Sequence, residues 1–415
     1  MADSPSYKAL FAGRMKKSIL FITTHNLASN PRLVKEAELA LSMHYGVDIV
    51  CFEFNNWSKS INEQIKNKLA HASITCIAAG RQPLLPWIRS VFYETFFRLL
   101  GTIWPLTDEK LSFAVSRRSV LLGEAVKKKS KPDLIVCHYP GALWPGCKAA
   151  DFFNCDVAFD MEDYHPGEGG NRQQQKITEK LFCRLLPMMS YISFAAPLFA
   201  EETEKTLGKQ IKNKLTVLNY FSATEFSVSE KKSGIVKVVW FSQHITAGRG
   251  LELILPFIKK NISLVELTLV GNMDPMFKKE YLQHAANIKI AAPTQQKDLH
   301  HFLSNFDIGL SLDIPHEKNR ELSITNKLLA YAQAGLYILA SNTTAQAHFF
   351  NEFPHMGVCI PFNKNYSMSD NEIQKVFENI EQIRNSKKER DAFNSNNNWE
   401  KESIKLKQAW QNLAE

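Results

Sequence analysis

The sequence contains few of the short patterns that assign a function directly. Its seven cysteines are scattered and odd in number, and no two of them have CxxC spacing. We therefore expect neither a disulfide framework nor structural zinc, and we predict a reducing, cytoplasmic compartment. No uncharged apolar run reaches the roughly 18 residues that a membrane-spanning helix requires. Residues 1–17 lack the apolar core of a signal peptide, so we interpret them as an N-terminal extension.

Several motifs of nucleotide and metal enzymes are also missing. No GxGxxG follows a predicted strand and no GxxxxGK[ST] occurs, which argues against a dinucleotide dehydrogenase and a P-loop NTPase. There is no HExxH or other paired metal-ligand spacing, so we expect no metal. The basic-aromatic motifs of known nucleic-acid modules are absent as well, and we expect no nucleic-acid partner.

The composition is that of a globular protein, with 45% apolar and 22% charged residues. A length of 415 residues predicts two or three domains. Fifty Lys and Arg against 42 Asp and Glu give a net charge of +8. That excess suits an anionic substrate, an anionic lipid surface or nucleic acid without selecting one. Phenylalanine is frequent, at 27 residues.

From Ser18 onward the chain alternates short apolar runs with helical patterns. The predicted strands are 18–23, 47–52, 133–137 and 157–159 in the first half, and 235–241, 264–270, 288–290, 307–312 and 337–340 in the second. Asn30 and Pro31 predict the start of a helix that Gly46 ends, and further helices are expected at 251–259 and 326–334. This alternation predicts an α/β protein with doubly wound parallel sheets. Residues 221–234 are polar and aperiodic, which indicates a linker between two Rossmann-like lobes.

Ligands of such sheets bind at the carboxyl ends of the strands, so the loops there carry the candidate site residues. Residues 24–32 lead into a helix N-terminus that suits an anionic or hydroxyl-rich ligand, with Asn30 and Arg32 as candidates. The alternative is a capped turn with a solvated arginine. Residues 160–168 follow another strand and contain groups that could bind sugar hydroxyls or take a proton: Asp160, Glu162, Asp163 and His165. The alternative is a solvated acidic loop. His138 ends a third strand and is a weaker candidate.

Two loops of the second half carry cations. Residues 240–250 place Arg249 beside Gly250 before a helix, where charge and backbone N–H groups together could hold a phosphate. Lys327 lies in the first turn of the helix that starts at Asn326, where a positive charge is unfavourable unless an anion is near. A diphosphate held between Arg249 and Lys327 would account for both cations. The alternative is that both are solvated.

Together these segments resemble the glycosyltransferases of the GT-B fold, and glycosyltransferase family 4 in particular. SNPRLVKEA (29–37) resembles the first loop and helix of bacterial members, and DMEDYH (160–165) lies where they have an acceptor loop. GRGLELI (248–254) resembles their KG loop, and NKLLAYAQAGLYILAS (326–341) resembles their donor-site helix. NNWEKE (397–402) resembles the terminal helix that crosses back onto the first lobe.

The resemblance implies two lobes that face a cleft: an acceptor-binding lobe (18–222), a donor-binding lobe (235–395) and a returning C-terminal helix (396–415). It places Arg249 and Lys327 at the donor diphosphate, with Gly250 and Asn326 shaping that pocket. It places the acidic loop on the acceptor side. It further implies retention of the anomeric configuration and no obligatory metal. As donor we expect a nucleotide sugar, a UDP-sugar rather than a GDP-sugar.

The chain departs from the family at the donor site. The two glutamates of the family's Ex7E pattern fall at Leu322 and Ala330, and an arginine of the second-lobe loop falls at Gln243. Glu321 could take over part of the lost contact. We therefore predict a glycosyltransferase acting on a glycan or lipid-linked acceptor, and keep two alternatives. One is a weakly active nucleotide-sugar-binding subunit of a glycan assembly complex, and the other is a GT-B-type nucleotide-sugar epimerase.

Many of the aromatic residues gather in one segment. Residues 84–104 are apolar and aromatic with interleaved arginines, and residues 127–131 add lysines later in the same lobe. Such a helix could lie in the interface of an anionic membrane, at its inner face. The alternatives are a helix hairpin packed on the protein core and a contact with a dimer partner.

Overall fold

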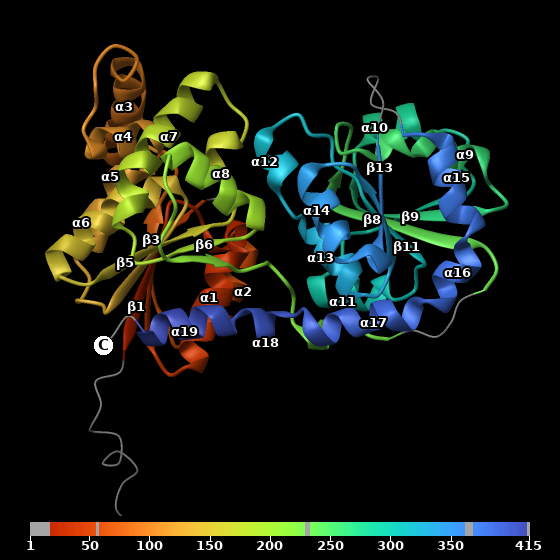
Figure 1. Ribbon diagram of the computed structural model, residues 1–415. Coiled ribbons are helices and arrows are strands. Elements are labelled where there is room, and N and C mark those ends of the chain that lie inside the picture. Colours follow the sequence, from red (N-terminus) through yellow and green to blue (C-terminus); the bar gives the residue numbers. More distant parts are fainter. Residues whose placement is uncertain (1–16, 55–57, 229–232, 362–367, 413–415) are drawn as a thin grey trace, which may run out of the picture.

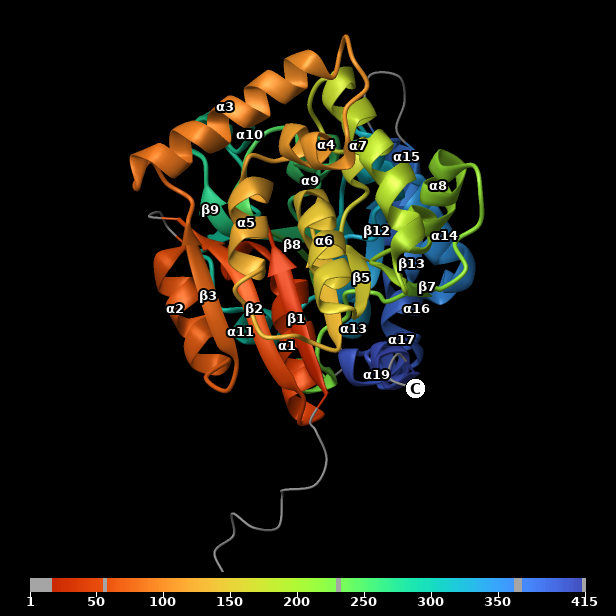
Figure 2. The ribbon, with the colours of Figure 1, turned by 90° about the vertical axis from the view of Figure 1, so that its left-hand side faces the viewer.

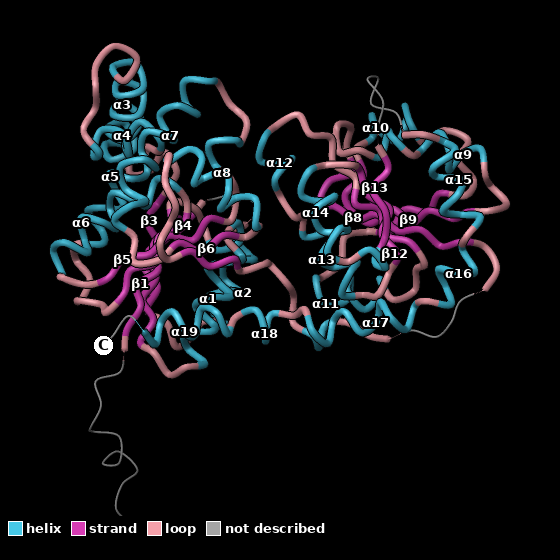
Figure 3. The backbone as a smooth tube through the Cα atoms, in the orientation of Figure 1, coloured by secondary structure: helices cyan, strands magenta, loops and turns pink. Residues whose placement is uncertain are grey.

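The computed structural model describes residues 17–54, 58–228, 233–361 and 368–412, which form two α/β lobes (Figure 1). The predicted N-terminal extension lies outside these ranges except for Lys17. In both lobes the strands form a central sheet with helices on both faces, as Figure 3 shows in its colouring by secondary structure.

The sheet of the first lobe has seven parallel strands in the order β3-β2-β1-β4-β5-β6-β7. These strands are β1 (Ser18–Thr23), β2 (Gly46–Glu53), β3 (Ser73–Ala78), β4 (Leu134–His138), β5 (Asp156–Met161), β6 (Ile192–Phe194) and β7 (Lys214–Thr216). The central strands are apolar and buried because helices cover both faces of a parallel sheet. Those helices are α1 (Pro31–Ser42), α2 (Lys59–Lys68), α3 (Leu84–Leu100), α4 (Asp108–Val115), α5 (Arg118–Val126), α6 (Leu143–Phe153), α7 (Arg172–Leu185) and α8 (Pro197–Leu207).

The second lobe repeats this plan with six parallel strands in the order β10-β9-β8-β11-β12-β13. Its strands are β8 (Val236–Ile245), β9 (Val265–Met273), β10 (Ile288–Ala291), β11 (Ile308–Ser311), β12 (Tyr337–Ser341) and β13 (Gly357–Ile360). Its helices are α9 (Leu255–Lys260), α10 (Pro275–Tyr281), α11 (Gln296–Leu303), α12 (Lys318–Leu322), α13 (Asn326–Gln333), α14 (Thr344–Glu352), α15 (Asp370–Glu378), α16 (Ile380–Asn385) and α17 (Lys387–Asn396). The strand order reverses between β1 and β4 and between β8 and β11, where ligands of such sheets bind.

The chain returns to the first lobe at its C-terminal end, as predicted. Helices α17, α18 (Trp399–Glu402) and α19 (Ile404–Asn412) run along one side of the molecule from the second lobe to the first (Figure 1). Leu406 and Trp410 are buried in the core of the first lobe, and the Trp410 indole N–H donates to the Tyr191 hydroxyl at 2.8 Å. Packing and a buried hydrogen bond therefore hold the last helix on the first lobe.

Several predicted element boundaries were wrong. Helix α1 ends at Ser42 rather than at Gly46, because His44 takes a left-handed conformation with φ 60° and turns the chain into β2. Strand β5 continues to Met161, so Asp160 belongs to the sheet and not to the loop after it. Strand β8 continues to Ile245 past an irregularity between Phe241 and His244, and the predicted helix 251–259 is divided into a 3-10 turn and α9.

Candidate functional site

Three cations converge at the carboxyl ends of β8 and β11 in the second lobe. Arg249, Arg320 and Lys327 each act electrostatically on Asp313, which follows β11. Burial raises the pKa of Asp313, and the three cations oppose that rise. Within the described ranges none of the three makes an ion pair, and one Asp313 carboxylate oxygen is buried without a hydrogen-bond partner. Three cations around one carboxylate leave an excess of positive charge that suits an anionic ligand.

Local backbone geometry places these cations. Gly250 has φ +86°, and a Cβ at this position would lie 2.8 Å from the Leu312 Cβ, so the Arg249 loop passes close to the end of β11. The Arg249 guanidinium donates to the Ser242 hydroxyl at 2.9 Å. Thr325 caps α13, which puts Lys327 in its first turn with its amine 5.8 Å from the centroid of the Trp240 ring.

The other predicted donor residues have protein partners or face solvent. Glu321 accepts hydrogen bonds from the backbone N–H and the hydroxyl of Thr344 and so caps the start of α14. The Asn326 side chain accepts from the Asn219 amide at 2.9 Å, which joins the donor helix to the segment between the lobes. Gln243 is exposed on β8. Ala330 is fully buried within α13 and Leu322 is buried on α12, so neither stands in for a ribose-binding glutamate.

In the first lobe, Arg32 and Asp160 form a buried ion pair. The Arg32 guanidinium makes two hydrogen bonds to the Asp160 carboxylate, at 2.8 and 2.5 Å, and a third to the Val217 carbonyl at 2.8 Å. The Ser193 hydroxyl also donates to Asp160, at 2.6 Å. Burial alone would raise the pKa of Asp160, but the charge and hydrogen bonds of Arg32 lower it, so the carboxylate stays ionised.

His138 and Asn30 are buried beside this pair. His138 lies between Glu36, 3.5 Å from its Nε2, and Asp160, 3.6 Å from its Nδ1. Asn30 caps α1, as predicted, and its amide donates to the Thr23 hydroxyl at 3.2 Å. Asp160, Arg32, His138 and Asn30 are thus all sealed among protein groups.

Glu36, His138 and Asp160 form a group that could in principle hold a metal ion. The donor set fits poorly, because the Arg32 guanidinium already binds both oxygens of Asp160 and would repel a cation. Burial and the nearby Asp160 carboxylate raise the pKa of Glu36, which favours its neutral form. We assign no metal to this cluster.

An accessible group of polar side chains lines a cavity of about 250 Å³ at the carboxyl end of the first sheet. His25 stacks on Tyr139 with ring centroids 3.6 Å apart, and Tyr139 lies 5.3 Å from the His165 ring. The His165 Nδ1 is 2.7 Å from the Glu168 carboxylate, while its Nε2 has no hydrogen-bond partner among the residues that the structure describes. Burial acts to lower the pKa of His165, but the charge and hydrogen bond of Glu168 outweigh it and the pKa is raised. Burial and Arg118 lower the pKa of His25 to about 3, so this ring is neutral.

Of the two remaining predicted acids, Asp163 connects the loop after β5 to the second lobe. Burial raises the pKa of Glu162 to about 8, and Asp163 adds to the rise. Asp163 accepts from the Asn319 amide at 2.9 Å, and the Tyr164 N–H donates to the Asn319 side chain at 2.8 Å. Asn319 belongs to α12, which lies at the edge of the second lobe that faces the first (Figure 1).

The two lobes also enclose a cleft. A cavity of about 460 Å³ is lined by Tyr164 and Glu202 from the first lobe and by Glu317 and Lys318 from the second. Lys318 pairs with Glu202, and its amine lies 5.9 Å from the centroid of the Tyr164 ring. Arg320 follows Asn319 on α12, so the residue that binds the acidic loop of the first lobe is next in sequence to a member of the cation group.

Several residues of these clusters were missed as candidates from the sequence, among them His25, Tyr139, Glu168, Asp313 and Arg320. His25, Tyr139 and Asp313 each come one to two residues after a strand, so strand ends were the signal that could have found them. Glu168 lies in the acidic loop that was recognised, three residues after His165. Arg320 lies on a five-residue helix with no periodic pattern, and no sequence signal indicates it.

No protein-family model and no curated protein matches this sequence. Solved structures do match over nearly the whole chain. A sucrose-phosphate synthase from Thermosynechococcus elongatus is 14% identical, with a TM-score of 0.64, and covers 96% of this chain and 99% of its own. HepE from Anabaena in complex with UDP is 12% identical, with a TM-score of 0.66, and the match covers 95% of this chain and 100% of HepE. A glycosyltransferase from Rickettsia africae is 11% identical, with a TM-score of 0.68, and the match covers 96% of this chain and 98% of the Rickettsia protein. At these identities the likeness shows the fold, which is the GT-B fold with two Rossmann-like lobes; the likeness to family 4 stays a prediction.

Proposed function

We propose that the protein is a glycosyltransferase that takes a sugar from a UDP-sugar. The observation that carries this proposal is the group formed by Arg249, Arg320 and Lys327 at the carboxyl ends of β8 and β11, three cations that have no ion-pair partner in the described part of the chain. A diphosphate brings negative charge that these cations would neutralise, and its charge grows as the sugar leaves. The solved complex of HepE with UDP, on the same fold, supports this choice of nucleotide.

We assign acceptor binding to the cavity around His165. Glu168 holds the Nδ1 of His165 and raises its pKa, which favours the protonated ring. In that form the Nε2, which has no partner among the described residues, can donate a hydrogen bond to an oxygen of the acceptor or of the transferred sugar. Glu162 and Asp163 border the same loop and can accept hydrogen bonds from sugar hydroxyls. Asp160 then acts as a positioning residue, because it holds Arg32 and His138 and does not reach the cavity. We expect retention of anomeric configuration.

Binding calorimetry with UDP and UDP-glucose tests the donor site. We expect Lys327→Ala and Arg320→Ala each to weaken UDP binding by tenfold or more, since each removes a charge next to the diphosphate. Lys278→Ala, an exposed lysine of α10, is the matched control and should bind UDP as the unchanged protein does. If the unchanged protein failed to bind UDP and other nucleotides at millimolar concentration, the donor assignment would be wrong.

Turnover separates the proposal from its alternatives. Purified protein is incubated with a panel of UDP-sugars, with and without sugar or lipid-linked acceptors, and the products are identified by mass and by the NMR coupling of the new anomeric proton. Transfer to an acceptor supports the proposal. Nucleotide binding without turnover would favour a binding subunit, consistent with Leu322 and Ala330 in place of the family's glutamates. Conversion of a UDP-sugar without an acceptor would indicate an epimerase.

A further inference from the structure

The helix α3 exposes a continuous apolar stripe on the outside of the first lobe. Leu85, Ile88, Phe92, Phe96 and Leu99 lie within about 80° of one another around the helix axis at 100° per residue. Their exposure is large, at 79% for Leu85, 58% for Phe92 and 65% for Leu99. Ile103 and Trp104 extend the stripe past the end of the helix at 75% and 64% exposure. Figure 2 shows α3 as a long helix lying across the outside of the lobe.

The inner side of α3 is only loosely packed on the lobe. Ser90 is its single buried residue, and two cavities of about 400 and 220 Å³ lie against it. On this side Phe97 and Leu100 still pack against the core of the first lobe, whereas the stripe on the other side of α3 has no such cover. An exposed apolar surface of this length marks an interaction site.

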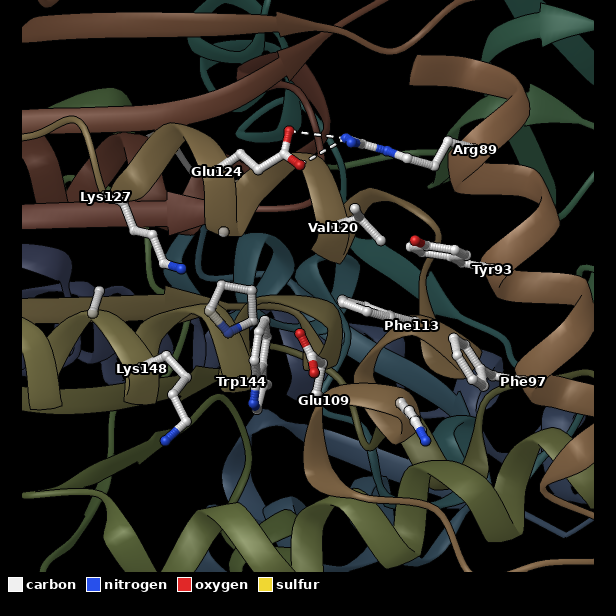
Figure 4. A pocket seen from close by; sticks show the side chains of 14 residues that line it. Arg89, Tyr93, Phe97, Glu109, Phe113, Val120, Glu124, Lys127, Trp144 and Lys148 are labelled. Atoms are coloured by element: carbon white, nitrogen blue, oxygen red, sulfur yellow. Dashed lines mark hydrogen bonds and ion pairs between the residues drawn. The ribbon is translucent and has the colours of Figure 1, made fainter. Parts of the chain in front are cut away.

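The larger cavity lies along the flank of α3 next to the stripe. Figure 4 shows Arg89, Tyr93 and Phe97 reaching into it from α3, with Lys127 and Lys148 on its opposite side. The aromatic rings of Phe113 and Trp144 complete its wall. An aromatic wall with cations at the rim is the combination that side chains form at the headgroup depth of a bilayer.

Positive charge gathers on the side of α3 where the two cavities lie. The residues lining the two cavities include seven cations, namely Arg89, Lys110, Arg117, Arg118, Lys127, Lys128 and Lys148, against only two carboxylates, Glu109 and Glu124. Glu124 is paired with Arg89 at 2.8 Å. Two copies of the chain docked through this stripe would bring the same cations face to face, which is unfavourable. Anionic lipid headgroups would instead neutralise them.

We propose that α3 docks the first lobe onto a bilayer containing anionic lipids, with the stripe among the acyl chains and the flanking cations at the headgroup phosphates. No helix of the described ranges is long and apolar enough to cross a bilayer, so α3 lies along the surface rather than through it. Docking places the first lobe, and the cavity around His165 with it, at the membrane. It does not depend on the proposed sugar transfer.

Vesicle flotation of the full chain tests this inference. We expect the protein to bind vesicles of phosphatidylcholine mixed with phosphatidylglycerol, and to bind less as the salt concentration rises. The combined variant Phe92→Ser, Phe96→Ser and Leu99→Ser should lower binding by tenfold or more. All three side chains are exposed, so the fold should be retained. The matched control changes three exposed apolar residues elsewhere, Phe152→Ser, Ile262→Ser and Met276→Ser, and should bind as the unchanged protein does.

A second pair of variants tests the charge. Lys127→Glu with Lys128→Glu should weaken binding to anionic vesicles by several-fold, whereas Lys278→Glu with Lys279→Glu on α10 should not. The inference is overturned if the unchanged protein does not float with anionic vesicles or if the stripe variant binds them equally well. It is also overturned if the stripe instead drives dimerisation in lipid-free buffer. UDP binding measured on the same preparations is a separate readout, so failure of membrane docking and failure of the donor site are distinguishable.

Discussion

Replacing Asp160 by asparagine should destabilise the first lobe strongly while leaving its shape nearly unchanged. Asparagine has the size of aspartate but no charge, so the Arg32 guanidinium would remain buried next to a neutral amide. Arg32 would keep its bond to the Val217 carbonyl, and the Ser193 hydroxyl could still donate to the amide oxygen. What is lost is the charge partner of a buried cation.

The expected cost is about 3–5 kcal/mol, the usual result of removing one partner of a buried ion pair. The side chains of Arg32 and Asp160 are exposed by only 2% and 0%, so solvent does not screen the loss. This is a large share of the roughly 5–15 kcal/mol that stabilises a typical protein. The double variant Arg32→Met with Asp160→Leu removes both charges, and should therefore be less destabilised than Asp160→Leu alone, by about 1–3 kcal/mol.

The pH dependence of stability provides an independent check that ionised Asp160 stabilises the folded protein. Because the pKa of Asp160 is lowered in the folded protein, its stabilising contribution is complete above its unfolded pKa of about 4 and is lost as the pH falls through the folded pKa. Asp160→Asn has no such contribution to lose. The stability difference between the two proteins should therefore shrink toward low pH.

The free energy of unfolding of the first lobe is measured by urea titration, with hydrogen exchange of peptides from β4 and β5 as the probe. A probe within this lobe is needed because the two lobes need not unfold together. Asp151→Asn is the control, because Asp151 pairs with Lys148 at 3.2 Å on the exposed surface and should matter by less than about 0.5 kcal/mol. A cost below about 1 kcal/mol for Asp160→Asn, or a double variant as unstable as the sum of its single changes, would refute the reasoning.

Three further outcomes are expected. If His165 acts as a hydrogen-bond donor, activity should fall as the pH rises through its raised pKa. Glu168→Gln removes the charge that raises this pKa, so the fall in activity should move to lower pH in a pH–rate profile. Gly250→Ala should cost about 1–3 kcal/mol in calorimetric unfolding, because φ is +86° and the new Cβ would lie 2.8 Å from a leucine Cβ. Trp410→Phe should cost about 1–3 kcal/mol, because it leaves a buried tyrosine hydroxyl without its 2.8 Å donor, and urea unfolding would measure the loss.

The fold was largely predictable because parallel strands covered on both faces read as short apolar runs. The runs at β1, β4 and β8 were located to within a few residues, and the loops after their carboxyl ends then indicated where a ligand binds. The returning C-terminal helix was predicted from resemblance alone. Strand ends were less accurate, and at Asp160 the error of two residues matters. Side chains alternate between the two faces of a strand, so a residue still inside β5 is held in the sheet and sealed by Arg32.

The candidate site shows why residue chemistry was predictable only in part. Arg249 and Lys327 could be proposed from local patterns, because Arg249 precedes a loop glycine and Lys327 lies in the first turn of a helix. The bonds from Asn319 to Asp163 and to the Tyr164 backbone join residues about 155 positions apart, and they exist only because the lobes meet at α12. No local pattern encodes such a meeting. The same reasoning explains α3: its apolar sequence was visible, but only the packing of the lobe shows which of its sides stays exposed.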